Sequence, residues 1–283
     1  MSQDWVQSDE AAGLVDAPEP FFAPITIDRT GQTLAIDEPT IRRVTRGRAR
    51  AGHAVSMFLR QAFHEGRVRL SKKPYFRRRE NEAARLGYCS LTPAEFDGIN
   101  ARQRWANWRV IPRNLDARLT SAPVTAIDLC CGVGHSTEVL AFYLSPGSRI
   151  LGLEYNPRFV EAARCRDFRD ENGEPADVQF REQSVLETFR GADGEVVPAG
   201  SIGFVNSSGA VGCHFDGTAT AALLDEVARV LRPGGLATID SGPDGTTPGE
   251  LIELATRRGF EPLNRARSCM FDRFEQICLR RQS

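Results

Sequence analysis

The spacing of apolar residues changes from irregular to regular near residue 121. Beyond that point, short apolar runs predict buried strands at 124–129, 149–155, 178–184, 201–207, 236–240, 260–266 and 274–279. Apolar residues at helical spacing predict helices between the first strands, at 135–144, 157–170, 219–231 and 248–258. Strands joined through helices take right-handed crossovers. We therefore expect an α/β fold with a doubly wound, mainly parallel seven-stranded sheet, whose last strand is reversed because no helix precedes it.

The first 120 residues predict a mostly helical extension. Thr92, Pro93 and Glu95 form a capping box that starts a helix running to about Val110. Its aromatic residues are either core or a lid over a pocket, two interpretations that sequence does not separate: Phe96, Trp105 and Trp108. A β-hairpin is expected at 25–37, and residues 1–20 are polar and acidic enough to predict a mobile arm. We expect domains at 1–120, a cap facing the substrate, and at 121–283.

Composition limits the class of protein. The 283 residues are 41% apolar and carry a net charge of −1, which predicts a packed core and no overall attraction to nucleic acid. No apolar run approaches the roughly 20 residues of a membrane span. The seven cysteines, with no export signal at the N-terminus, predict reduced thiols and a cytoplasmic location. The oligomeric state stays open, with a homodimer as one candidate.

The segment from Arg42 to Arg79 is strongly basic, with Glu65 as its single acidic residue. It is either a contact for phosphate, on RNA or an anionic substrate, or a solvated helix face balanced by acidic residues elsewhere. The near-neutral total charge favours the second interpretation. Apolar residues at helical spacing inside the segment are expected to pack: Val55, Phe58, Leu59 and Phe63.

The stretch from Val124 to Thr137 predicts a strand, a glycine turn and a helix. This order brings backbone N–H groups and a helix N-terminus close to a ligand. The ends of the parallel strands meet at one edge, which places four polar residues together: Asp128, Glu154, Ser184 and Asn206. Glu154 ends the second strand, where a carboxylate accepts hydrogen bonds from ribose hydroxyls. Thr137 stands where a dinucleotide site needs a third glycine, so a nucleoside without pyrophosphate is favoured over a nicotinamide dinucleotide.

Several motifs together resemble the class I S-adenosylmethionine-dependent methyltransferases. The run 128–134 resembles the first motif of that family, with Cys130 at the position of its first glycine. The run 151–157 resembles the second motif, and Leu231 to Gly235 resembles the turn after the fourth helix. Two positions depart from the family: Ser184 and Gly203 stand where acidic residues are usual. The resemblance implies S-adenosylmethionine as the methyl donor and S-adenosylhomocysteine as the product. The cofactor-binding residues that it implies are Asp128, Cys130, Gly132, Gly134, Glu154, Tyr155, Ser184, Val185 and Asn206.

The implied chemistry is an in-line displacement at a sulfonium methyl, in which alignment of donor and acceptor does most of the work. A base is needed only when the acceptor must lose a proton. His214, in the loop that faces the methyl in the family, is the candidate base, with a structural loop histidine as the alternative. His135 is expected to cap or pack. Cys130 and Cys131 lack metal-ligand spacing, so no metal site is expected. Cys213 is a second candidate, as a thiol nucleophile. The interpretation of this stretch as the loop that faces the methyl group is preferred, because the whole predicted fold agrees with it.

Three functions agree with these residues. The first is transfer of a methyl group to a small-molecule acceptor, of which a secondary metabolite is one example. The second keeps the fold and uses RNA as the acceptor, bound through the segment from Arg42 to Arg79. The third is a regulatory module that binds S-adenosylmethionine without catalysis, which Gly203 and Ser184 favour. A small-molecule methyltransferase, with no membrane partner and without nucleic acid as its substrate, is the preferred hypothesis.

Overall fold

The computed structural model describes residues 53–70 and 87–283. The predicted arm at 1–20, the hairpin at 25–37 and most of the basic segment lie outside these residues. Within them, no helix is long and apolar enough to cross a membrane.

The seven-stranded sheet predicted from the sequence is present, in the order β3-β2-β1-β4-β5-β7-β6. β7 pairs antiparallel with both β5 and β6, and the other pairs are parallel. The order reverses between β1 and β4, which is where ligands bind in open sheets of this kind. The strands are β1 (Thr125–Leu129), β2 (Arg149–Glu154), β3 (Asp177–Glu182), β4 (Ile202–Ser207), β5 (Leu231–Ser241), β6 (Phe260–Ala266) and β7 (Glu275–Arg281).

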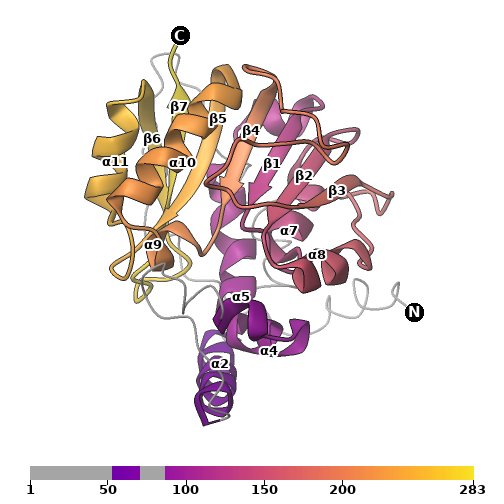
Figure 1. Ribbon diagram of the computed structural model, residues 1–283, viewed down its shortest axis with the longest axis vertical. Helices are drawn as coiled ribbons and strands as arrows, with labels where there is room; N and C mark the ends of the chain where they lie inside the picture. The colour runs from indigo at the N-terminus through magenta and orange to yellow at the C-terminus, as the bar shows by residue number, and fades with distance from the viewer. Residues whose placement is uncertain (1–52, 71–86) are drawn as a thin grey trace, which may run out of the picture.

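Helices cover both faces of the sheet, as Figure 1 shows. On one face, α7 (His135–Tyr143) and α8 (Pro157–Arg164) join a core that includes Ala126 of β1. On the other face, α10 (Gly217–Val230) and α11 (Pro248–Thr256) join a second core, which includes Ile127, the next residue of β1. Successive residues of a strand point to opposite faces, so each buried strand contributes to both cores.

Two predicted helices differ from the observed ones. The helix expected at 157–170 ends at Arg164. The chain beyond it forms a turn, in which Asp170 accepts hydrogen bonds from the backbone N–H groups of Asn172 and Glu174. The helix expected from Thr92 to Val110 is two helices, α4 (Pro93–Ile99) and α5 (Ala101–Val110), which meet at Asn100. The Thr92 capping box is present. A 3₁₀ turn, η1 (Ile111–Asn114), and the short α6 (Ala117–Ser121) lead into β1.

The helices α4 and α5 lie at the end of the sheet where β1 and β4 finish, and α2 (His53–Leu70) packs beyond them (Figure 1). Trp105 and Trp108 are core residues, 4% and 3% exposed. Phe96 instead covers the glycine turn, because its ring lies 2.7 Å from where a Cβ on Gly132 would stand. The aromatic residues of this segment therefore divide between the two interpretations, two in the core and one over the turn.

The apolar residues of α2 correct one prediction. Val55, Phe58, Leu59 and Phe63 were expected to pack, but they are 69%, 42%, 66% and 63% exposed. The physical reason is the position of α2, which contacts α4 and α5 rather than the sheet. Helical spacing predicts that these residues share a face but does not determine what covers that face.

Candidate functional site

The turn after β1 is built from residues in left-handed conformations. Cys130 has φ 51°, and it is the one non-glycine residue with positive φ in the described ranges. Gly132 and Gly134 have φ 56° and 86°, and Gly134 precedes the first residue of α7. These angles explain the glycines, and they show that Cys130 occupies a position where glycine would fit without strain.

Glu154 ends β2 with a buried carboxylate, 1% exposed. Its Oε1 accepts the backbone N–H of Asn156 at 2.8 Å, and its Oε2 accepts the N–H of Gly132 at 3.0 Å. The hydroxyl of Tyr88 also donates to Oε2, at 3.1 Å. Burial raises the pKa of Glu154 to about 7, although these hydrogen bonds favour the ionised form. The predicted ribose acid therefore lies directly against the glycine turn.

Asp128 lies one strand away and is fully buried. The hydroxyls of Ser136 and Thr137 donate to its Oδ2 at 2.7 and 2.6 Å, and Asn206 Nδ2 donates to its Oδ1 at 2.7 Å. Burial raises the pKa of Asp128 to about 6. The carboxylate thus ties the start of α7 to β1 and β4, which shapes the turn from beneath.

Asn206 is also fully buried and belongs to a polar network inside the sheet. Its Oδ1 accepts hydrogen bonds from Thr238 Oγ1 and Gln276 Nε2, both at 2.9 Å. Gln276 Oε1 in turn accepts a hydrogen bond from Asn114 at 3.1 Å. Both ends of the Asn206 amide are therefore hydrogen bonded within the protein, to Asp128 and to residues of neighbouring strands.

Tyr155 follows Glu154 and stacks on Tyr88, with ring centroids 5.1 Å apart and planes 30° apart. Tyr88 also meets Phe159 of α8 edge to face, at 5.1 Å. This aromatic group covers the carboxyl end of β2, and Tyr88 comes from the segment before α4. No pattern in the sequence indicates Tyr88, because this residue lies outside every motif and outside the predicted helix.

Ser184 and Val185 follow the end of β3, whose Glu182 is in register with Glu154. Ser184 is half-buried, and its hydroxyl accepts the N–H of Leu186 at 3.3 Å. Val185 is 5% exposed and packs in the core below the sheet edge. Ser184 therefore follows the strand next to Glu154, whereas the side chain of Val185 is not available to a ligand.

His214 ends the four-residue helix α9 (Val211–His214), directly after the loop that follows β4, and it is half-buried. Its neighbour Cys213 is a poor nucleophile, because burial and the charge of Asp240 raise the pKa of its thiol. Gly203 has no room for an acidic side chain, since its Cβ would lie 2.3 Å from Val124 Cγ2. His135 Nε2 lies 2.8 Å from Asp97, so His135 joins α7 to α4.

A polar cluster on α5 faces the loop after β4, and motif spacing did not indicate it. Gln103 Nε2 donates to Asn107 Oδ1 at 2.8 Å and to Ser208 Oγ at 3.0 Å. Ser208 Oγ donates to Asn107 Oδ1 at 2.7 Å. Gly209 lies close to the same glutamine, because an added Cβ would be 3.1 Å from it.

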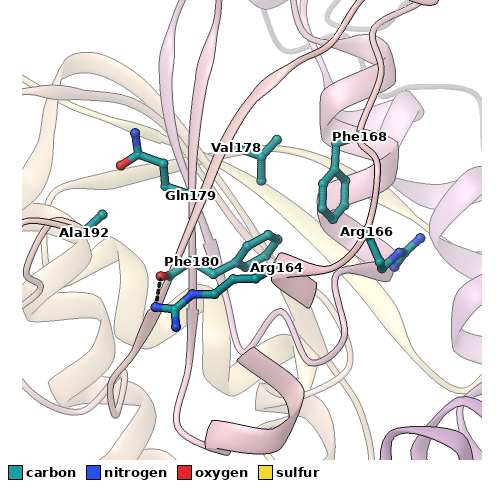
Figure 2. A pocket seen from close by; sticks show the side chains of 7 residues that line it. All are labelled: Arg164, Arg166, Phe168, Val178, Gln179, Phe180 and Ala192. Atoms are coloured by element: carbon teal, nitrogen blue, oxygen red, sulfur yellow. Dashed lines mark hydrogen bonds between the residues drawn. The ribbon is translucent and has the colours of Figure 1, made fainter. Parts of the chain in front are cut away.

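A separate cavity of about 310 Å³ lies at the outer edge of the sheet, between α8 and β3 (Figure 2). Arg164 reaches across it and donates to the carbonyl of Phe180 at 2.9 Å. None of the predicted site residues lines this cavity. The lining residues are Arg164, Arg166, Phe168, Val178, Gln179, Phe180 and Ala192.

Part of the chain matches a known protein family. Residues 126–235 match the family model described as a methyltransferase domain. A comparison with curated proteins found no match. Among solved structures, an arsenic(III) S-adenosylmethionine methyltransferase from Chlamydomonas reinhardtii is similar, with 17% identity over 56% of this chain and 64% of that protein, at a TM-score of 0.44. The chain thus spans less than two thirds of that protein.

Two further structures are similar over a larger share of their own length. An S-adenosylmethionine-dependent methyltransferase from Mesorhizobium loti shares 17% identity over 57% of this chain and 93% of that one, with a TM-score of 0.44. A methyltransferase of the same kind from Methanosarcina mazei shares 16% identity over 58% and 95% of the two chains, with a TM-score of 0.45.

The domain match and the sheet coincide along the chain. Residues 126–235, which match the methyltransferase domain model, include most of β1, all of β2 to β4 and the beginning of β5.

Proposed function

We propose that the protein is an S-adenosylmethionine-dependent methyltransferase, which transfers the methyl group of S-adenosylmethionine to a small-molecule acceptor enclosed between the sheet and the N-terminal helices. The observation that carries this proposal is the packing of α5 on the loop after β4, where Gln103 is hydrogen bonded to Ser208. We expect an acceptor held under these helices to be small, because a polymer would have to extrude a single unit to reach an enclosed site. Residues 1–120 then act as the cap and 121–283 as the donor-binding domain.

The residues around the turn fit a nucleoside donor. The backbone of Cys130, Gly132 and Gly134 approaches it at the start of α7, and Glu154 supplies the acceptor oxygens for its ribose hydroxyls. When bound, the donor supplies a methyl group activated on a positively charged sulfur.

The other proposed residues support this site from its sides. Tyr155 and Ser184, with the backbone of Val185, border the base of the nucleoside. Asp128 and Asn206 act from beneath by fixing the turn, and the hydrogen bond between them supports this role.

Glu154 provides the test of donor binding. At a pH above the raised pKa of Glu154, we expect Glu154→Gln to weaken binding of S-adenosylhomocysteine by about 10- to 100-fold, because an ionised acceptor for two hydroxyls is lost. Isothermal titration calorimetry measures the change. Glu182→Gln is the matched control, since Glu182 occupies the register position next to Glu154 on the edge strand and is exposed. Equal affinities for the two variants would remove Glu154 from the site.

His214 is proposed as the base for acceptors that lose a proton. We expect His214→Asn to lower kcat by about 10²- to 10⁴-fold on an oxygen acceptor. Its affinity for S-adenosylhomocysteine should stay unchanged, which calorimetry on the same sample checks. Unchanged turnover on an acceptor with a phenol or alcohol group would assign His214 a structural role.

A screen for methyl transfer separates the acceptor classes. Transfer to metabolite-sized acceptors should be nearly independent of salt. The described arginines of the basic segment favour this outcome, because Arg60 lies 3.8 Å from Asp97 and Arg67 lies over the ring of Phe63. Turnover on RNA that falls steeply between low and moderate salt would instead support the second function.

A further inference from the structure

Tyr88 occupies a position at Glu154 that a ribose hydroxyl needs. Its hydroxyl donates to Glu154 Oε2 at 3.1 Å, and the N–H of Gly132 already takes the same oxygen at 3.0 Å. A carboxylate oxygen has two lone pairs, so Oε2 is fully occupied. The other oxygen holds the N–H of Asn156. While Tyr88 stays in place, Glu154 therefore cannot accept hydrogen bonds from both hydroxyls of a ribose.

The segment that carries Tyr88 is held by hydrogen bonds and by contacts between aromatic rings. The carbonyl of Tyr88 accepts Asn156 Nδ2 at 3.2 Å, and its ring packs on Tyr155 and Phe159. Phe96 contacts the ring of Tyr88 at 5.7 Å and covers Gly132. The same short segment, from Tyr88 to Phe96, therefore contacts both Glu154 and the glycine turn.

We propose that Tyr88 is an internal competitor of the donor: its hydroxyl substitutes for a ribose hydroxyl on Glu154, and the segment from Tyr88 to Phe96 moves away when S-adenosylmethionine binds. This inference rests on the proposed role of Glu154. Burial and the negative charge of Glu154 raise the pKa of Tyr88, so its hydroxyl keeps its proton and continues to donate. The binding-competent population is then the fraction of molecules in which this contact is broken, and the observed affinity is reduced by that fraction.

Tyr88→Phe tests the competition, because it removes the hydroxyl and keeps the ring. We expect S-adenosylhomocysteine to bind about tenfold more tightly and to associate faster in stopped-flow mixing. Without any ligand, hydrogen exchange of residues 88–96 should become faster. Tyr143→Phe is the matched control: Tyr143 lies on α7 beside Trp108 and Phe142, away from Glu154, and this variant should leave affinity and exchange unchanged.

A second variant loosens the segment without touching Glu154. Phe96→Leu should also speed association, because the contact with Phe159 at 4.4 Å is weakened. Equal or weaker binding by Tyr88→Phe would overturn the proposal, since it would mean that Tyr88 supports Glu154 rather than competes for it. Failure of the proposed function looks different: wild type and all variants would then show no saturable binding.

Discussion

At the scale of single residues, the site depends on backbone angles and on two buried carboxylates. Cys130, Gly132 and Gly134 give the turn its shape, and Asp128 and Glu154 hold it from two sides. Within the described residues, the hydrogen bonds found for these two carboxylates come from hydroxyl, amide and backbone groups rather than from basic side chains. Burial raises both pKa values. The protein therefore retains two desolvated acids next to the turn that it must keep rigid.

Cys130 tests the backbone argument. We expect Cys130→Gly to raise the free energy of unfolding by up to about 1 kcal/mol, because glycine adopts φ 51° without the clash that a side chain meets. Urea denaturation measures the change. The neighbouring Cys131 has no positive φ and is buried, so Cys131→Gly should lower stability instead. A loss of stability on Cys130→Gly would mean that the thiol contributes more than its strain costs.

The raised pKa of Glu154 predicts how stability depends on pH. The folded protein keeps a proton on Glu154 up to about pH 7, whereas the unfolded chain releases it near 4.5. This contribution to stability is complete at low pH and is lost as pH rises toward the folded pKa. Asp128 acts in the same direction with a pKa of about 6.

We therefore expect the unfolding free energy of the wild type to fall more steeply than that of Glu154→Gln between about pH 5 and pH 7.5. The difference should be on the order of 3 kcal/mol. Urea denaturation across this pH range gives both curves, and parallel curves would contradict the assignment.

At the scale of elements, α9 is held close to the loop between β5 and α11. Asp240 Oδ2 accepts the N–H of Gly212 at 2.9 Å, and the N–H of Gly245 donates to the carbonyl of Gly212 at 2.7 Å. A Cβ on Gly212 would lie 2.4 Å from the backbone of Ser241. The glycine thus allows the backbone contact that positions Cys213 and His214.

Two glycines of neighbouring elements should respond to alanine in opposite directions. Gly212→Ala should cost about 1 to 3 kcal/mol, because the clash is with backbone that cannot rotate away. Gly249→Ala, near the start of α11, should gain about 0.5 to 1 kcal/mol, because nothing lies within 4 Å of its Cβ. Thermal or urea unfolding measures both, and a stable Gly212→Ala protein would show that α9 packs more loosely.

At the scale of the whole molecule, Arg102 connects the N-terminal helices to the loop between β6 and β7. Arg102 on α5 pairs with Asp272 at 3.0 Å, with side chains 17% and 5% exposed. Its guanidinium also lies over Phe58 of α2 and Phe274, at 5.4 and 5.2 Å. One side chain therefore joins α2, α5 and the end of the sheet.

Arg102→Met should lower the free energy of unfolding by about 2 to 4 kcal/mol, because it leaves the carboxylate of Asp272 buried without its counter-charge. Arg257→Gln is the control, since Arg257 and its partner Glu253 are 68% and 62% exposed and should contribute within about 0.5 kcal/mol. Urea denaturation compares the two variants. Equal effects would show that Arg102 does not connect the helices to the sheet.

Patterns along the chain were enough to predict the order of strands and helices, the reversed last strand and the glycine turn. These features depend on local spacing: apolar periodicity sets each element, and the turn requires residues that accept positive φ. The same local information predicted that Glu154 ends β2 beside that turn. It also placed His214 after β4, while its role stays a proposal.

The contacts that these residues make with distant parts of the chain became visible with the folded structure. No spacing along the chain indicates that Tyr88 reaches Glu154 across 66 positions, or that Gln103 meets Ser208. The structure also shows that the side chain of Asn206 is hydrogen bonded to its neighbours. Four apolar residues of α2 are exposed: Val55, Phe58, Leu59 and Phe63. Contacts between distant segments depend on how helices pack against the sheet, and that packing is decided by the shapes of whole surfaces rather than by any local pattern.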